Sequence, residues 1–104
     1  MAKTAKQLFS GSLTTTLTTT LYTAPALTPA AIVKEITVAN NNITTARNVT
    51  ITVNGKKVTP AEPVPPSSKQ VIALSTVMAT GQTIQGGQDT GTDVDVTISG
   101  IEYS

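Results

Sequence analysis

Apolar and polar residues alternate most clearly in the middle of the 104-residue chain. From Val49 to Val53 every second residue is apolar and the residues between are threonines, which is the period of a strand with one buried and one solvated face. Asn54-Gly55 follows at once, and this pair accepts the positive φ angles of a type I′ turn. Residues 56–59 then return, so the pattern predicts a β-hairpin.

The same period predicts further strands along the chain, at residues 13–22, 31–39, 69–74, 82–85 and 93–103. Between them lie predicted connections, namely a loop over residues 23–30, a stiff proline-rich segment over 60–68 and a flexible loop over 86–91.

Two strands carry a residue that breaks their pattern. Lys34 falls on the apolar face of its strand, so we expect it near an edge with its aliphatic stem buried. In the last strand Val94, Val96 and Ile98 point inward. Gly100 predicts a bulge there, because the apolar residues after it fall on the opposite parity.

The segment 13–22 (LTTTLTTTLY) repeats every four residues, so Leu13, Leu17 and Leu21 share one face of a strand. They would also align on a helix, but the many threonines disfavour one. A threonine-lined flat strand is also typical of ice-binding surfaces. The β-propensity of threonine is the simpler interpretation.

Residues 1–12 are predicted to lie outside the main domain as an arm, because Ser10-Gly11-Ser12 would end any helix that began there. Leu8 and Phe9 are its large apolar side chains. Either the terminus frays with Phe9 tucked under the sheet, or the arm docks Leu8 and Phe9 on a neighbouring subunit.

Taken together, these elements predict an all-β fold: an antiparallel, jelly-roll-like β-sandwich of about seven to eight short strands over residues 13–104. Threonine makes up about a fifth of the chain and aromatic residues only 3%, so the core must be aliphatic and lean. Such a core barely offsets the conformational entropy of folding. We therefore expect additional burial between copies of the chain.

Charge and composition exclude several functions. Seven basic residues oppose six acidic ones without a basic stripe, which argues against nucleic-acid binding, and no apolar run is long enough for a membrane span or an export signal. Histidine and cysteine are both absent, so the chain alone cannot build a zinc site, a Ser-His triad or a Cys-His dyad. We predict no enzymatic activity and no cofactor.

The acidic residues of the C-terminal third suggest a candidate cation site. Asp89, Asp93 and Asp95 lie near two glycines and could supply carboxylates to Ca²⁺, but their spacing matches no known calcium loop. Solvated positions on an outer face are the simpler interpretation. Pairs of carboxylates could also suit a glycosidase, yet the aromatic residues that would line a sugar cleft are scarce.

The segments LYTAPA (21–26) and AIVKEITVAN (31–40) resemble a recurrent pattern in small bacteriophage virion proteins. The resemblance covers most of residues 17–102 and continues at 53–56, 80–85 and 94–102. Ala24 departs from it, since valine is commoner there. The family implies a β-sandwich or jelly-roll module on the outside of a phage particle, as a capsid cement or decoration protein, a head-fibre base or a tail appendage, without catalytic residues.

The resulting hypothesis is a homo-oligomeric capsid decoration protein, with a trimer favoured, that binds the major capsid protein or other virion proteins. It would be made in the host cytoplasm and end on the particle surface. The alternative is a tail-tip or fibre module that binds a host receptor or glycan. The residues predicted at interfaces are Leu8, Phe9, Leu13, Leu17, Tyr22 and Tyr103.

Overall fold

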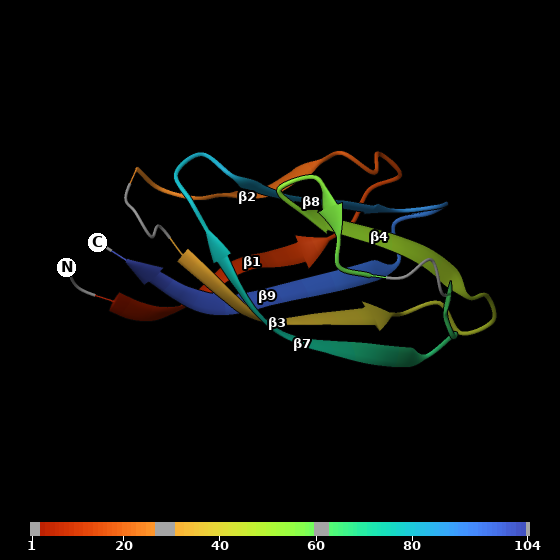
Figure 1. Ribbon diagram of the computed structural model, residues 1–104. Helices are drawn as coiled ribbons and strands as arrows, with labels where there is room; N and C mark the ends of the chain where they lie inside the picture. The colour runs from red at the N-terminus through yellow and green to blue at the C-terminus, as the bar shows by residue number, and fades with distance from the viewer. Residues whose placement is uncertain (1–2, 27–30, 60–62, 104) are drawn as a thin grey trace.

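A computed structural model describes residues 3–26, 31–59 and 63–103. Over these residues the chain forms nine β-strands and no helix, so no described helix is long and apolar enough to span a membrane. The strands pack as two facing antiparallel sheets, which confirms the predicted all-β sandwich (Figure 1). They are β1 (Lys3–Ser12), β2 (Thr20–Thr23), β3 (Ala31–Asn40), β4 (Arg47–Val53), β5 (Lys56–Lys57), β6 (Pro63–Val64), β7 (Ser68–Met78), β8 (Thr83–Gln88) and β9 (Val94–Tyr103).

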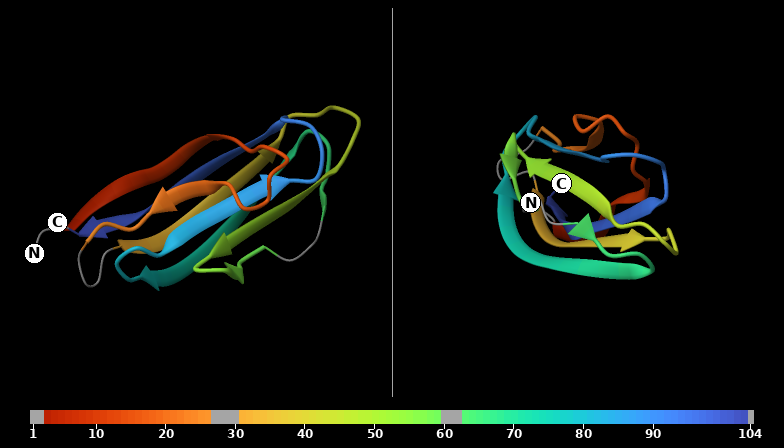
Figure 2. Two further views of the ribbon diagram at one scale, coloured as in Figure 1. Left: turned by 90° about the horizontal axis from the view of Figure 1, so that it is seen from above. Right: turned by 90° about the vertical axis from the view of Figure 1, so that its right-hand side faces the viewer.

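The first sheet has four strands in the order β1-β9-β3-β7. The second, five-stranded sheet has the order β2-β8-β4-β5, and β6 pairs with the beginning of β4. The sandwich is elongated, with extents of 47 by 21 by 19 Å. Seen along its length, the two layers face each other and β7 curves round one side (Figure 2).

Aliphatic side chains from both sheets fill the space between them. Inward positions of β3 and β9 in one sheet meet those of β4 and β8 in the other, and all of these are almost fully buried. The group comprises Val33, Ile36, Val38, Val94, Val96, Ile98, Val49, Ile51, Val53 and Ile84. The inward residues predicted for the middle hairpin and for the last strand are therefore confirmed.

The predicted turn at Asn54-Gly55 is also confirmed. Asn54 has a φ of 51° and Gly55 a φ of 75°, the left-handed values that a type I′ turn requires at both central residues. The turn connects β4 to the two-residue strand β5, with Val53 opposite Lys56.

The N-terminal segment is not an arm. Residues 3–12 form β1, which pairs along its whole length with β9 and borders the four-stranded sheet. Leu8 is 8% exposed and belongs to the core, and Phe9 packs against it. The register shifts between Gln7 and Phe9, which brings the neighbouring residues Leu8 and Phe9 onto the inner side of the sheet. The sequence of β1 therefore lacks the regular alternation of apolar and polar residues that predicts a strand.

The threonine-rich segment is mostly a connection. Only Thr20–Thr23 forms a strand, whereas residues 13–19 cross from one sheet to the other. The prediction of a strand from residue 13, and with it a flat threonine-lined surface, was therefore wrong. The crossing chain lies against Gly87, where an added Cβ would come within 2.6 Å of the carbonyl oxygen of Thr16. Gly86 and Gly87 belong to β8, where they pair with Ile51 and Thr50 of β4, and not to the predicted flexible loop.

The irregularity predicted at Gly100 lies on the neighbouring strands. β9 keeps its alternation through Gly100, whereas β3 shifts register between Val33 and Glu35 opposite it. Lys34 is the extra residue of that bulge and is exposed, so its predicted buried stem was wrong. Glycine is needed at position 100 because an added Cβ would lie 2.3 Å from the carbonyl oxygen of Ile32.

Two predicted connections fall partly outside the described residues. Residues 27–30 of the first (23–30) and residues 60–62 of the second (60–68) are not described. In the described part of the second, Pro63–Val64 pairs with β4, and Ser68 already begins β7.

Candidate functional site

The three aspartates of residues 89–95, weighed above as a cation site, make separate contacts. Asp89 accepts a backbone N–H within its own loop at 2.8 Å. Asp95 accepts hydrogen bonds from the Ser12 hydroxyl at 2.6 Å and the Asn41 amide at 2.7 Å. Across residues 3–26, 31–59 and 63–103, no three acidic, histidine or cysteine side chains gather as metal ligands. The fold therefore does not assemble the weighed site.

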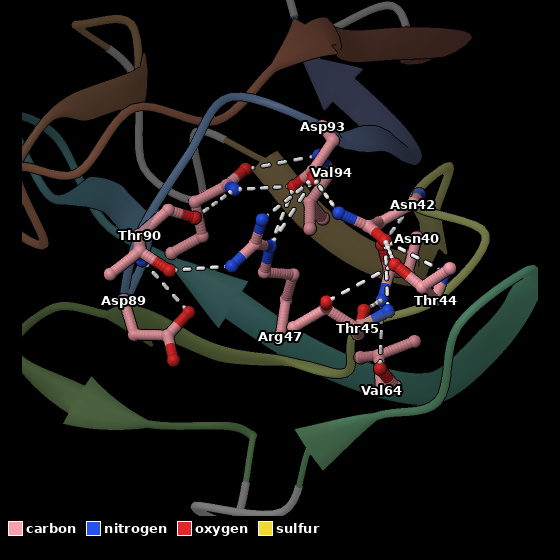
Figure 3. A network of polar contacts seen from close by, with 11 residues as sticks. Asn40, Asn42, Thr44, Thr45, Arg47, Val64, Asp89, Thr90, Asp93 and Val94 are labelled. Carbon is pink, nitrogen blue, oxygen red and sulfur yellow. Dashed lines mark hydrogen bonds and ion pairs between the residues drawn. The ribbon is translucent and has the colours of Figure 1, made fainter.

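Asp93 is the centre of a polar network at one end of the sandwich (Figure 3). Arg47 donates from Nε to its Oδ1 at 3.0 Å and from a terminal nitrogen to its Oδ2 at 3.0 Å. Asn42 and Gln88 each donate a further hydrogen bond at 2.9 Å. The Arg47 guanidinium, with help from the Asn42 amide, holds the pKa of the Asp93 carboxyl well below its ordinary value. Both carboxylate oxygens are thus already occupied by nitrogen donors.

Gln88 is the fully buried member of this network, with an exposed fraction of 0%. Its amide nitrogen donates to the carbonyl of Thr90 at 2.6 Å and to Asp93, and its amide oxygen accepts the N–H of Val94 at 3.0 Å. A buried amide costs free energy unless its polar atoms are paired, and here they are. Sequence reasoning missed this residue, although it continues the inward parity of Ile84 in β8.

A second buried amide organises the loop beside this network. Asn40 is 2% exposed and donates to the carbonyls of Thr45 and Val64, both at 3.0 Å. In the next turn the side-chain oxygen of Asn42 accepts the N–H of Thr44 and of Thr45, at 2.9 and 2.8 Å. Together these contacts connect β6 and the loop over residues 41–46 to the end of β3, so they hold the fold together and do not form an open binding site.

At the opposite end, Tyr22, Glu102 and Lys6 connect the two sheets. The Tyr22 hydroxyl donates to one oxygen of Glu102, and the Lys6 ammonium lies 2.8 Å from the other. The Lys6 contact lowers the pKa of Glu102, while burial and then Glu102 raise the pKa of Tyr22. The carboxylate stays charged and the phenol stays neutral near pH 7, so this cluster holds strands together and does not exchange protons there.

The residues predicted at interfaces separate into two groups. Leu8 and Leu13 lie in the core of their own chain, with 8% and 1% exposure, so neither is available to a partner as predicted. Phe9 and Tyr22 are half-buried and make the internal contacts described above. Leu17, at 43% exposed, lies on the surface of the crossing loop, and Tyr103 is half-buried at the end of β9.

The outer face of the four-stranded sheet carries a row of apolar residues. Its strand register aligns Ala5, Ile101, Ile32 and Val77 in one row that crosses all four strands. Val77 is 59% exposed, and the next rows carry mainly threonine, serine and alanine. Sequence reasoning did not find this row, since its members come from four strands that are distant in the sequence.

A shallow depression of about 450 Å³ lies where β3 ends and β7 begins. It is lined by Ala39, Asn40, Asn41, Ser67, Ser68 and Lys69. Asn41, Ser67, Ser68 and Lys69 can donate hydrogen bonds to a polar ligand, whereas the Asn40 amide already donates to Thr45 and Val64. Among the described residues, no aromatic ring lines the depression.

Comparisons with known proteins give a limited result. No protein-family model and no curated protein matches the sequence. Among solved structures, a family 35 carbohydrate-binding module from Clostridium thermocellum superposes with a TM-score of 0.47 at 14% identity, over 100% of both chains. A CBM35 module from Paenibacillus barcinonensis gives a TM-score of 0.42 at 15% identity, again over 100% of both chains. Likeness at this level carries no inference about what the chain binds.

Proposed function

We propose that this chain is a non-enzymatic module of a bacteriophage particle, which acts by joining its surfaces to copies of itself and to other virion proteins. The specific form proposed is a homo-oligomeric decoration protein that binds the major capsid protein. The resemblance in sequence to phage virion proteins suggests the setting. The observation that supports the mode of action is the exposed outer face of the four-stranded sheet, with its apolar row ending at Val77.

This face suits a protein partner because apolar side chains that remain exposed gain free energy when another surface covers them. The hydroxyl side chains beside the row can pair with backbone or polar groups of that partner. By contrast, the charged clusters at Asp93 and Glu102 are consumed by contacts within the chain. The side chains that can contact a partner therefore lie on the sheet face and not in the charged clusters, which favours binding through this face.

Purified particles provide the direct test. We expect mass spectrometry to detect the chain in them, at a copy number proportional to that of the major capsid protein. Particles that lack the chain should bind it when it is added back. Val77→Lys, which places a charge in the apolar row, should lower occupancy at least about tenfold.

The matched control is Gln85→Lys, which adds the same charge to the outer side of β8 in the other sheet. We expect its occupancy to equal that of the unmodified chain. Absence of the chain from particles, or equal binding by both variants, would contradict docking through this face.

The depression beside Lys69 supports a second candidate function, the binding of a host-surface glycan. Amide, hydroxyl and ammonium donors line it, and these groups can bind sugar hydroxyls. The absence of a lining aromatic ring makes this the weaker candidate. Measurable binding of the isolated chain to host polysaccharide, reduced by Asn41→Ala, would favour this candidate over decoration.

A further inference from the structure

β7 is an edge strand that carries a single charged residue, Lys69, near its beginning. It has eleven residues and, within the described part of the chain, pairs only with β3. Natural proteins usually blunt such an edge with charged residues or proline. Residues 70–78 contain neither. Outward-facing Val71 and Val77 are 54% and 59% exposed, and inward-facing Ile72 and Leu74 are only partly buried.

We propose that β7 pairs with β7 of a second copy, antiparallel and across a two-fold axis, so that two four-stranded sheets become one continuous sheet. The added strand would satisfy the outward N–H and C=O groups of β7. It would also cover Val71 on the outer face and Ile72 on the inner face. This proposal deepens the self-association in the proposed function and rests on that part of it alone.

The bulge in the sheet limits the register. β7 pairs regularly with β3 from Ser68 to Ala73, and the register then shifts before Thr76. A two-fold partner can follow β7 only along this regular run. An axis through Val71 lies near its middle and places the exposed Val71 side chains of the two copies opposite each other, where they cover one another.

Charge complementarity selects the same register. With Val71 on the axis, Lys69 of the second copy faces Ala73. Ala73 pairs with Glu35 of β3, so the Lys69 side chain of the second copy enters the row that contains Glu35. The backbones of β3 and of the second copy's β7 are then about 10 Å apart. On this face of the sheet only the Ala73 methyl group lies between Lys69 and Glu35, so the two long side chains can meet. The two-fold axis produces this ion pair twice.

Neither charged residue has an ion-pair partner among the described residues. Lys69 and Glu35 are exposed, and Glu35 accepts one hydrogen bond, from the Thr37 hydroxyl at 3.5 Å. Asp95, which lies in the row of Lys69 within one chain, already accepts hydrogen bonds from Ser12 and Asn41. Axes through Gln70 or Ile72 would place Lys69 opposite Val71 or Ser75 of the second copy, away from the Glu35 row.

Cross-linking tests the axis directly, because the chain has no cysteine. In Val71→Cys the two introduced thiols should lie opposite each other, at a distance suited to a disulfide. We expect mild oxidation to convert most of this variant into a covalent dimer. The control is Ala5→Cys, which places an exposed thiol on β1, the other edge, and should remain largely monomeric. A covalent dimer of both variants, or of neither, would overturn the proposal.

Charge exchange tests the register independently in sedimentation. We expect the unmodified chain to dimerise with a dissociation constant on the order of micromolar, because one strand pair makes a small interface. Lys69→Glu and Glu35→Lys should each raise this constant at least about tenfold, and the double variant should restore it. Val77→Lys, beyond the bulge, serves as a matched control and should leave it unchanged. Failure of the double variant to recover would overturn this register.

The outcomes also separate this proposal from the proposed function. If the chain occupies particles but sediments as a monomer, or as a trimer that joins β7 to β1, the β7–β7 pairing is wrong and the decoration role stands. If the chain dimerises through β7 but is absent from particles, the pairing stands and the decoration role is wrong.

Discussion

The two edge strands of the four-stranded sheet, β1 and β7, have opposite surface chemistry. β1 turns Leu8 into the core, presents serines outward at Ser10 and Ser12, and carries Lys6 in an ion pair with Glu102. β7 presents valines outward on a stretch without charge or proline. The same position in a sheet thus carries polar side chains and an internal ion pair on one edge, and exposed valines on the other. The side chains decide this, since the backbone groups are equivalent.

Removing β1 should have the largest effect. Deletion of residues 1–12 takes away Leu8 and Phe9 and leaves β9 as a new edge above an opened core. We expect the shortened chain to lose cooperative thermal unfolding in circular dichroism and to aggregate. A folded, cooperative product would show that residues 1–12 behave as the arm predicted from the sequence.

Truncating one β1 side chain should have the next largest effect. Leu8→Ala removes buried methyl groups and leaves a cavity beside Gly100, where an added Cβ would lie 3.1 Å from the Leu8 side chain. We expect a loss of about 2–4 kcal/mol in the free energy of unfolding. Urea denaturation measures it, and a change below about 0.5 kcal/mol would mean that Leu8 is not part of the core.

The Asp93 network lies beside the end of β1. Leu13, the residue after β1, donates its N–H to the carbonyl of Val94, the neighbour of Asp93. Substituting Asp93 therefore tests how much this network stabilises that end of the sheet. A carboxyl whose pKa is lower in the folded state than in the unfolded state stabilises the fold above the unfolded pKa of about 4, and this stabilisation disappears as the pH falls below that value. Asp93→Asn should therefore lower the thermal midpoint at pH 7, and the difference from the unmodified chain should shrink on acidification.

Asp89→Asn is the matched control for that measurement, since asparagine keeps the oxygen that accepts the loop N–H. We expect it to leave the midpoint unchanged at pH 7. If the deficit of Asp93→Asn stayed constant from pH 7 to pH 3, the contacts with Arg47 would not be the source of its stability.

Truncation on β7 should have the smallest effect. Val77→Ala removes a mainly exposed side chain on the far side of the bulge, so the free energy of unfolding should change by less than about 0.5 kcal/mol. The same substitution should still weaken particle binding, because Val77 ends the apolar row. A loss of stability comparable to that of Leu8→Ala would remove the contrast between the two edges.

Elements with strong local signals were predictable from the sequence. The hairpin around Asn54-Gly55 combines alternation with turn residues that tolerate positive φ, and the structure has it as predicted. The inward residues Val94, Val96 and Ile98 of β9 follow from the same alternation. In these places the local preference of the chain and the packing of the sandwich agree.

Where local and long-range requirements differ, the sequence prediction failed. The threonines of residues 13–19 favour a strand, yet this stretch must cross between sheets, over a glycine that leaves room for it. The candidate site shows the same limit. Asp93 looked like a solvated residue because its partners Arg47, Asn42 and Gln88 come from other segments.

The sequence by itself determined the class of the fold, the aliphatic core and the lack of groups for zinc or triad chemistry, because these follow from residue types and their local period. Only the tertiary structure decided that residues 3–12 belong to the sheet, that Lys34 bulges outward, and that four distant residues form one apolar row. Each of these depends on strand register, which is set by contacts between segments far apart in the chain.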